Sequence, residues 1–297
     1  LKGDRSGMFW PFWKLMRALG DDRRAPRIIA IENVCGTLTS HGGKDFGFIC
    51  SAFENFGYRC GAVIIDAALF VPQSRPRLFI IGVRDDVELP PHLVAHSPSF
   101  IWHTNALKIA HAKLTPGVRK NWIWWRLPEP PKRNITFKDL IEDHPTDVRW
   151  HSAEETRRLL AMMSAANIEK VERAKKLDRR MVGAIYKRTR PDDNGGKVQR
   201  AEIRFDDISG CLRTPGGGSS RQSVMIVEGK SVKSRLISSR ETARLMGLPD
   251  DYDLPSNYYE AYHLTGDGVV VPVVRHLAQN IFEPLLARQA DRKRRAA

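Results

Sequence analysis

Cysteine is scarce in this chain of 297 residues, which contains only Cys35, Cys50, Cys60 and Cys211. None of them forms a Cys-x-x-Cys pair, and the nine histidines show no spacing typical of metal ligands. The sequence therefore predicts neither a metal site nor a disulfide framework. Cys50 and Cys60 lie among apolar residues, where buried and unreactive thiols are expected.

Long apolar runs are also absent, since no stretch approaches the ~20 residues that a membrane span needs. The N-terminal residues mix Lys2, Asp4 and Arg5 with aromatic side chains and show no signal-peptide pattern. We therefore expect a soluble, cytoplasmic protein with no membrane partner. Hydrophobic residues make up 42% and charged residues 28%, a globular balance that allows one large domain or two modest ones.

Acidic residues are outnumbered, with 34 Asp and Glu against 48 Lys and Arg and a formal net charge of +14. Such an excess favours a polyanionic partner, because each basic side chain that neutralises a phosphate releases a condensed counterion. A basic enzyme unrelated to nucleic acid is the alternative, since charge bears on association and not on fold.

The first 88 residues alternate between helical and extended patterns. An apolar segment predicts a helix buried on most sides, and a short apolar run after it predicts a strand buried on both faces. A further helix and two strands follow, which together indicate βαβ units and a parallel sheet. The predicted elements are helices at 8–19 and 45–57 and strands at 27–31, 58–66 and 77–83.

Prolines from Pro90 onward mark a predicted domain boundary near residue 88. Beyond it, a short helix at 135–143 and a charged helical stretch at 153–176 precede a small β-rich part with long loops and three glycines at 216–218. The strand candidates there are AEIRF, CLRTP and SVMIV. Ser238 and Glu241 have capping-box spacing and predict a helix start, and a terminal helix follows Gly268.

Trp122, Trp124 and Trp125 lie beside basic residues in this second part. Aromatic and basic side chains together could stack on nucleic acid. Packing of a small domain by its largest side chains is the more common use of such a cluster, and both interpretations stay open.

Two groups of polar residues lie where chemistry is expected. Glu32, followed by Asn33 and Val34, ends a predicted buried strand, and ligand sites of open α/β sheets lie off such strand ends. Arg75 and Arg77 stand at alternate positions entering another strand, so both would project to one side. Arginine offers a rigid fork of donors for phosphate or a base edge. Neither group is specific alone.

The order and spacing of five motifs strongly resemble the cytosine-5 DNA methyltransferase family. They are residues 5–9 (RSGMF), 32–34 (ENV), 73–84 (QSRPRLFIIGVR), 234–255 and 266–274. The resemblance implies an α/β fold with an incomplete Rossmann-like methyltransferase sheet and a second, smaller β-rich target-recognition domain. It places part of the catalytic domain at 1–88, the recognition domain at 89–255, and a terminal helix returning to the catalytic domain at 256–297.

The family's chemistry is methyl transfer from S-adenosyl-L-methionine to carbon 5 of a cytosine that has been flipped out of double-stranded DNA, often within restriction–modification systems. Glu32 matches the glutamate that grips the N3 and amino edge of the base, and a raised pKa would suit that role. Arg75 and Arg77 match arginines beside the flipped base. Met8, Asp267 and Gly268 match segments that wall the cofactor pocket.

The basic recognition region supplies candidates for DNA contact. Most of its Lys and Arg are expected to touch phosphate or solvent. The residues predicted to contact DNA more specifically are Arg188, Arg204, Arg213, Arg221 and Gln222.

Several features depart from the family pattern. Gly266-Asp267 stands for the usual Gly-Asn, and Cys211-Leu212 stands for Thr-Leu. The Phe-x-Gly-x-Gly cofactor loop and the Pro-Cys-Gln loop of the nucleophile do not occur, and Cys35 matches a variable position. We therefore expect residues 1–297 alone to be inactive and to need an N-terminal methyltransferase fragment, in trans or upstream. A non-catalytic DNA-binding remnant is the main alternative, and an RNA-binding module is a weaker one.

Overall fold

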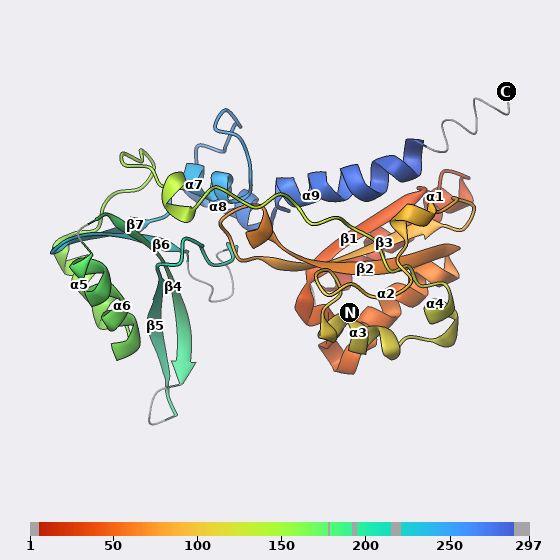
Figure 1. The fold of residues 1–297 in the computed structure, drawn as a ribbon, viewed down its shortest axis with the longest axis horizontal. Coiled ribbons are helices and arrows are strands. Elements are labelled where there is room, and N and C mark those ends of the chain that lie inside the picture. The colour runs from red at the N-terminus through yellow and green to blue at the C-terminus, as the bar shows by residue number, and fades with distance from the viewer. Residues whose placement is uncertain (1–5, 178, 192–194, 215–220, 288–297) are drawn as a thin grey trace. The chain divides into compact units, whose positions relative to one another are not determined.

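The computed structural model describes residues 6–177, 179–191, 195–214 and 221–287. It divides into two compact units (Figure 1). Unit 1 comprises 1–65, 76–129 and 275–297, and unit 2 comprises 66–75 and 130–274. Among the described helices, none is long and apolar enough to cross a membrane.

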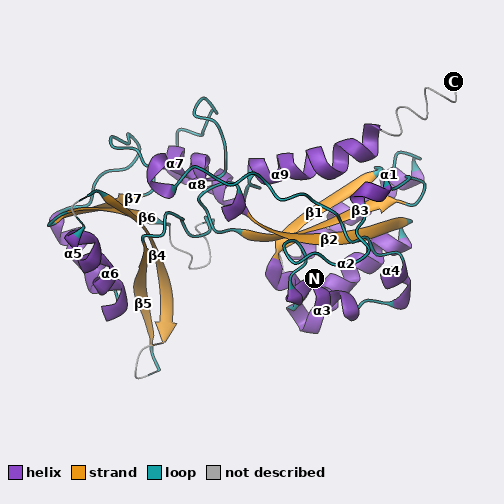
Figure 2. Ribbon diagram, in the orientation of Figure 1, coloured by secondary structure: helices purple, strands orange, loops and turns teal. Residues whose placement is uncertain are grey.

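Unit 1 contains a three-stranded sheet in the order β1-β3-β2, whose strands and covering helices are distinguished in Figure 2. The strands are β1 (Ile28–Val34), β2 (Tyr58–Asp66) and β3 (Pro76–Arg84). The strands predicted at 58–66 and 77–83 are confirmed, but β1 pairs antiparallel with β3, so the predicted parallel pairing is wrong there. Strand β3 runs back along β1, so that Ile28 lies opposite Val83 and Val34 lies opposite Arg77.

Four helices accompany this sheet, and α2 forms the centre of the core. They are α1 (Phe9–Asp21), α2 (Lys44–Asn55), α3 (Asn105–Ala112) and α4 (Pro116–Lys120). Phe46 and Phe53 of α2 are fully buried, as is Ile80 of β3. Gly82 allows close packing, because a Cβ there would lie 2.2 Å from the Phe53 ring. The helix predicted at 45–57 is confirmed.

The first helix and strand are more exposed than the sequence predicted. On α1, Trp13 and Met16 are buried, whereas Phe12 and Leu15 are exposed. On β1, Ile29 alone is buried. The predictions of burial on most sides of the helix and on both faces of the strand are therefore wrong. The physical reason is that, within the described ranges, β1 pairs with β3 alone and its other edge has no strand.

Unit 2 is built on an antiparallel sheet in the order β5-β4-β6-β7. Helices α5 (Ala153–Ala161) and α6 (Ala165–Lys176) pack on it through a core that includes Leu159, Val171, Ile185 and Met225. The helical stretch predicted at 153–176 is thus two helices. The strands are β4 (Met181–Pro191), β5 (Lys197–Arg204), β6 (Ser223–Glu228) and β7 (Ser231–Leu236).

The remaining elements of unit 2 follow local capping signals. Ser238 and Glu241 form the predicted capping box at the start of α7 (Ser239–Leu245). The helix predicted at 135–143 is only a 3-10 turn, Phe137–Leu140, capped by Thr136. Residues 211–214 are not a strand, contrary to prediction, and the glycines at 216–218 lie outside the described residues.

The last two α-helices among the described residues are α8 (Tyr258–Asp267) and α9 (Val271–Leu277). The sequence did not predict α8. The predicted terminal helix is confirmed, because α9 continues through a π-helical turn at Ala278–Phe282.

Candidate functional site

Glu32 and Arg77 are brought together by the register of β1 and β3. Glu32 lies opposite Phe79, and Val34 lies opposite Arg77, so the two charged residues are diagonal neighbours on one face of the sheet. The Nε atom of Arg77 lies 2.8 Å from Oε1 of Glu32. Their side chains are 17% and 26% exposed, although Oε1 of Glu32 is itself buried.

Asn33 shapes the end of the same strand. Its Oδ1 atom accepts a hydrogen bond of 2.8 Å from the backbone N–H of Val34. The chain then turns into the 3-10 segment Cys35–Leu38. This is the contact expected of a residue that positions the loop after Glu32.

Arg75 has a different environment, inside unit 2. Its side chain is buried, and its guanidinium donates to three carbonyl oxygens, those of Leu212 at 2.8 Å, Gly266 at 3.0 Å and Gly268 at 2.8 Å. Its backbone N–H donates to Oδ1 of Asp66 at 2.8 Å. Arg75 therefore ties the segment at 211–212 to the end of α8.

The alternation that predicted a common side for Arg75 and Arg77 does not apply, because β3 begins at Pro76 and Arg75 precedes it. Glu32 and Arg77 belong to unit 1, and Arg75 belongs to unit 2. Of the three residues predicted to lie around the base, Glu32 and Arg77 are in direct contact.

The residues predicted to bind the cofactor also belong to different units, Met8 to unit 1 and Asp267 and Gly268 to unit 2. Met8 is exposed in unit 1, and Asp267 is exposed in unit 2, where it accepts a hydrogen bond from the Thr214 hydroxyl. Gly266 lies so close to Thr214 that a Cβ would approach its backbone nitrogen to 2.9 Å. The Asp267 carboxylate suits an ammonium or hydroxyl donor. The described residues contain no cluster of potential metal ligands.

The residues predicted to contact DNA lie in two regions of unit 2. Arg188 and Arg204 are on the β4/β5 hairpin, where Arg188 stacks over Tyr186 at 4.6 Å from the ring centroid. Arg204 forms an ion pair with Asp206, and its hydrogen bond lowers the pKa of that carboxyl.

Arg213, Arg221 and Gln222 flank the residues at 215–220 that are not described. Arg213 is exposed, and Arg221 lies over the ring of Tyr259 at 4.8 Å. Gln222 is buried, donates to the Gly210 carbonyl at 2.9 Å and accepts from the Ser209 hydroxyl at 2.7 Å. In this structure its amide is engaged by the protein itself.

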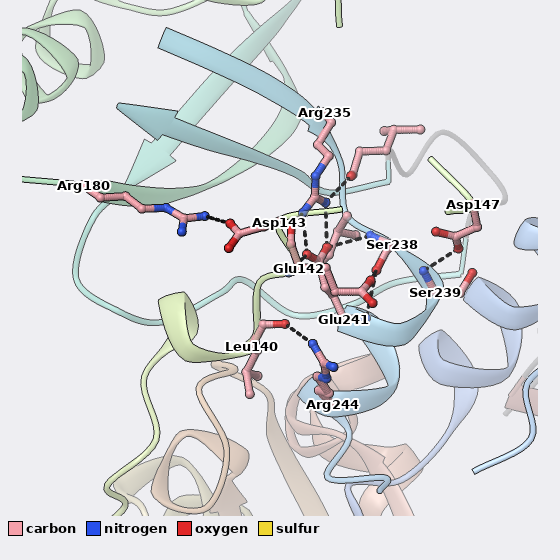
Figure 3. A network of polar contacts seen from close by, with 12 residues as sticks. Leu140, Glu142, Asp143, Asp147, Arg180, Arg235, Ser238, Ser239, Glu241 and Arg244 are labelled. Carbon is pink, nitrogen blue, oxygen red and sulfur yellow. Dashed lines mark hydrogen bonds and ion pairs between the residues drawn. The ribbon is translucent and has the colours of Figure 1, made fainter. Parts of the chain in front are cut away.

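A buried ion pair that the sequence did not reveal organises the centre of unit 2 (Figure 3). Arg235 and Glu241 are both fully buried and make two contacts, of 2.6 and 2.8 Å. Glu241 also accepts from the backbone N–H groups of Ser238 and Glu142. The capping box was visible in the sequence, but the ion pair of Glu241 with Arg235 was not.

Around this pair, Figure 3 shows contacts that hold the loop at 140–147. Arg244 donates to the Leu140 carbonyl at 2.9 Å, and Asp147 accepts from the Ser239 backbone at 2.8 Å. Arg180 lies 2.5 Å from Asp143 and lowers the pKa of its carboxyl. The motif at 234–255 therefore acts as a structural centre of unit 2.

The tryptophan cluster belongs to the packing of unit 1. Trp125 is fully buried. His111 lies 5.0 Å from Trp122 and 4.7 Å from Trp124, measured between ring centroids. The packing interpretation accounts for these contacts.

Comparison with known proteins identifies the family. The sequence profile of C-5 cytosine-specific DNA methylases matches residues 1–283. The chain belongs to this family. It is 25% identical to the orphan methyltransferase M.SPBetaI of Bacillus phage SPbeta, over 77% of this chain and 49% of the relative. It is 24% identical to the type II methyltransferase M.Bsp6I of Bacillus sp. (strain RFL6), over 89% of this chain and 67% of the relative.

A methylase fold is confirmed by a solved structure. The chain superposes on the crystal structure of a DNMT2 mutant from Spodoptera frugiperda with a TM-score of 0.50 and 16% identity. The matched region covers 91% of this chain and 71% of the DNMT2 chain. The predicted α/β methyltransferase class is therefore confirmed. The chain spans about half the length of the first of these curated methylase relatives.

Proposed function

We propose that this chain contributes the base-gripping and DNA-recognising part of an enzyme that methylates carbon 5 of cytosine in DNA. The observation that carries the proposal is the Glu32–Arg77 pair, held at 2.8 Å by strand register and partly exposed at the end of β1. Membership of the C-5 cytosine-specific methylase family supports the same chemistry. The type II and orphan methyltransferases among the relatives support a DNA substrate.

Glu32 has a defined task in this reaction. Carbon 5 of cytosine is a weak nucleophile until a thiolate adds to carbon 6 and makes carbon 5 enamine-like. We assign Oε2 of Glu32 to the N3 edge, where the carboxyl gives a proton to N3 during addition and takes it back during elimination. Arg77 binds Oε1 and so fixes the direction of the carboxyl group.

S-Adenosylmethionine supplies an electrophilic methyl group when it is bound. Asp267 would accept a hydrogen bond from an ammonium or hydroxyl group of this cofactor. Gly268 would allow a close backbone approach, and Met8 would present an apolar thioether surface. Arg75 would act as a positioning residue, since its guanidinium holds the carbonyls of Gly266 and Gly268 on either side of Asp267.

The nucleophilic thiolate would come from a further segment that adds a strand beside β1. Two observations support this assignment: among the described strands none pairs with the outer edge of β1, and the apolar side chains of Met8, Phe12 and Leu15 are exposed. These three residues follow helical i, i+4, i+7 spacing, so they form a second apolar face beside the buried one. An exposed strand edge of this kind favours pairing with another strand. The segment could lie on the same polypeptide or on another.

The test is methyl transfer to DNA by residues 1–297, with and without a segment that carries the Phe-x-Gly-x-Gly and Pro-Cys-Gln loops. Nucleoside analysis should find 5-methylcytosine only in the completed protein. Methyl transfer by residues 1–297 alone would refute the need for the segment. A methyl group found on the amino nitrogen of the base would refute methylation at carbon 5. DNA binding without any transfer in the completed protein would favour a non-catalytic remnant.

A further inference from the structure

Gln73 is fully buried where its own segment runs beside residues 209–212, inside unit 2. Gln73 and Ser209 form a parallel bridge between the two. The Ser209 backbone N–H donates to the Pro72 carbonyl at 2.8 Å, and the Ser74 N–H donates to the Ser209 carbonyl at 3.0 Å. These backbone contacts fix the register of residues 209–212 against the segment that carries Gln73.

The backbone of Leu212 is held at both of its polar groups. Oε1 of Gln73 accepts from the Leu212 N–H at 3.0 Å, and Arg75 donates to the Leu212 carbonyl at 2.8 Å. The Nε2 atom of Gln73 donates to the carbonyl of Leu245, the last residue of α7, at 2.8 Å. The Leu212 side chain is fully buried. One amide therefore connects Leu212 with the end of α7.

An amide meets both demands at this position. Glutamine carries an acceptor oxygen and a donor nitrogen on the same carbon, so a single side chain satisfies the Leu212 N–H and the Leu245 carbonyl. A buried backbone group that loses its partner carries a desolvation penalty. An ionised glutamate of the same length lacks the donor, and methionine offers neither an amide donor nor a carbonyl acceptor. The contacts therefore depend on the amide chemistry of Gln73 and not on its volume alone.

The segment held by this amide leads to residues predicted to contact DNA. Arg213 directly follows it and is exposed. Gln222, next to Arg221 in the sequence, donates to the Gly210 carbonyl at 2.9 Å. Both arginines therefore extend from backbone that is tied to residues 209–212. A displacement of this segment would change where the two guanidinium groups lie.

We propose that Gln73 is a positioning residue for target selection, whose amide sets the path of residues 209–212 and so the direction in which Arg213 extends toward DNA. This inference rests on the proposed function and deepens it. Gln73 touches neither base nor phosphate and acts through Leu212. Its loss should relax the choice of sequence more than it weakens total affinity, because contacts to phosphate supply affinity without reading sequence.

The experiment measures how strongly the full chain prefers one DNA sequence over others. Duplexes retained from a randomised library are sequenced, and fluorescence anisotropy then gives the affinity for the most enriched duplex and for a scrambled one. The proteins are the wild type, Gln73→Met and the control Asn167→Leu. Asn167 lies in α6, where its Oδ1 accepts from the Ile203 N–H at 3.2 Å. The control removes an amide–backbone contact of unit 2 and leaves the contacts of residues 209–212 in place.

In Gln73→Met, the ratio of affinities for the enriched and the scrambled duplex should fall on the order of tenfold, the discrimination that one base contact supplies. Affinity for the scrambled duplex should stay within about twofold of the wild type, because the phosphate contacts remain. The control should keep the wild-type ratio. Amide exchange at Leu212 should accelerate in Gln73→Met, while exchange in β4 stays at the wild-type rate.

An unchanged ratio in Gln73→Met, or an equal loss of affinity for both duplexes, would overturn the positioning role and leave the proposed function standing. A wild type without any sequence preference would overturn the role as well. Absence of DNA binding by the wild type would overturn both. If Gln73→Met does not fold, Gln73→Asn replaces it, because this variant keeps both polar groups on a side chain one methylene shorter, and the same outcomes decide.

Discussion

The Nε atom of Arg77 lies 2.8 Å from Oε1 of Glu32, across one diagonal of the β1/β3 pair. This contact uses one carboxylate oxygen and orients the other, so the Glu32 side chain is held in place before any base arrives. Preorganisation of this kind matters most in the step where a proton moves.

Arg77→Lys should therefore lower the rate of methyl transfer in the completed enzyme. A lysine keeps the charge but lacks the Nε–H of a rigid fork, so the Glu32 carboxyl would be misdirected. We expect a loss on the order of 10²-fold in kcat. DNA affinity should change little. Single-turnover kinetics and DNA titration measure the two effects, and equal losses in both would contradict a positioning role for Arg77.

The buried pair of Arg235 and Glu241 should dominate the stability of unit 2. Glu241→Ala leaves an uncompensated buried guanidinium and should lower the free energy of unfolding by about 3–5 kcal/mol. Arg149→Ala breaks an ion pair with Glu155 in which the arginine is 72% exposed, and it should change the free energy of unfolding far less than Glu241→Ala does. Urea unfolding gives both values. Similar small losses in the two variants would show that the buried pair is dispensable.

Arg75→Lys should loosen the link between residues 211–212 and the end of α8. A lysine ammonium cannot span the carbonyls of Leu212, Gly266 and Gly268 in the arrangement of the guanidinium. Amide hydrogen exchange at 211–214 and 264–268 should accelerate, while exchange in β4 should stay at the wild-type rate. Uniform acceleration across unit 2 would indicate global destabilisation and would contradict a local tie.

His103 should make the protein less stable in mild acid. Burial lowers the pKa of its imidazole from 6.5 to about 4, while its Nδ1 atom accepts a hydrogen bond from the Ser99 backbone. Between these two pKa values the unfolded chain binds the proton and the folded chain does not, so stability falls as pH drops from 6.5 to 4. The shift corresponds to on the order of 3 kcal/mol at most.

His103→Asn keeps an acceptor for the Ser99 N–H and removes the titrating ring. Its unfolding free energy should depend less on pH between 6.5 and 4 than that of the wild type. Urea titrations at both ends of this range give the comparison. Equal pH dependence in the two proteins would rule out His103 as a source of acid sensitivity.

Local signals in the sequence predicted much of the fold. The apolar runs of β2 and β3, the helical spacing of α2 and the capping box of Ser238 and Glu241 all appear as expected. Strand β4 was not predicted, because only its first half packs on the core and its outer half, Lys187 to Pro191, carries polar and basic residues. A period of two is hard to recognise where both faces are polar.

Long-range partners were beyond the sequence. The proximity of Glu32 and Arg77 depends on the antiparallel register of β1 and β3, and the sequence had indicated a parallel sheet. The burial of Arg75 depends on carbonyls more than 130 positions away along the chain. The contact of Glu241 with the Glu142 backbone joins residues almost 100 positions apart. Local sequence patterns carry no information about contacts between residues that are distant in the chain.

The most direct test of the role of Glu32 is tritium release from carbon 5 of labelled cytosine in DNA by the completed enzyme. Release reports the enamine-like intermediate that Glu32 is proposed to promote. Glu32→Gln should slow release on the order of 10²-fold or more, as expected for loss of a general acid, while duplex affinity stays within about twofold. Release at the wild-type rate, or an equal loss of affinity, would contradict a proton-sharing role for Glu32.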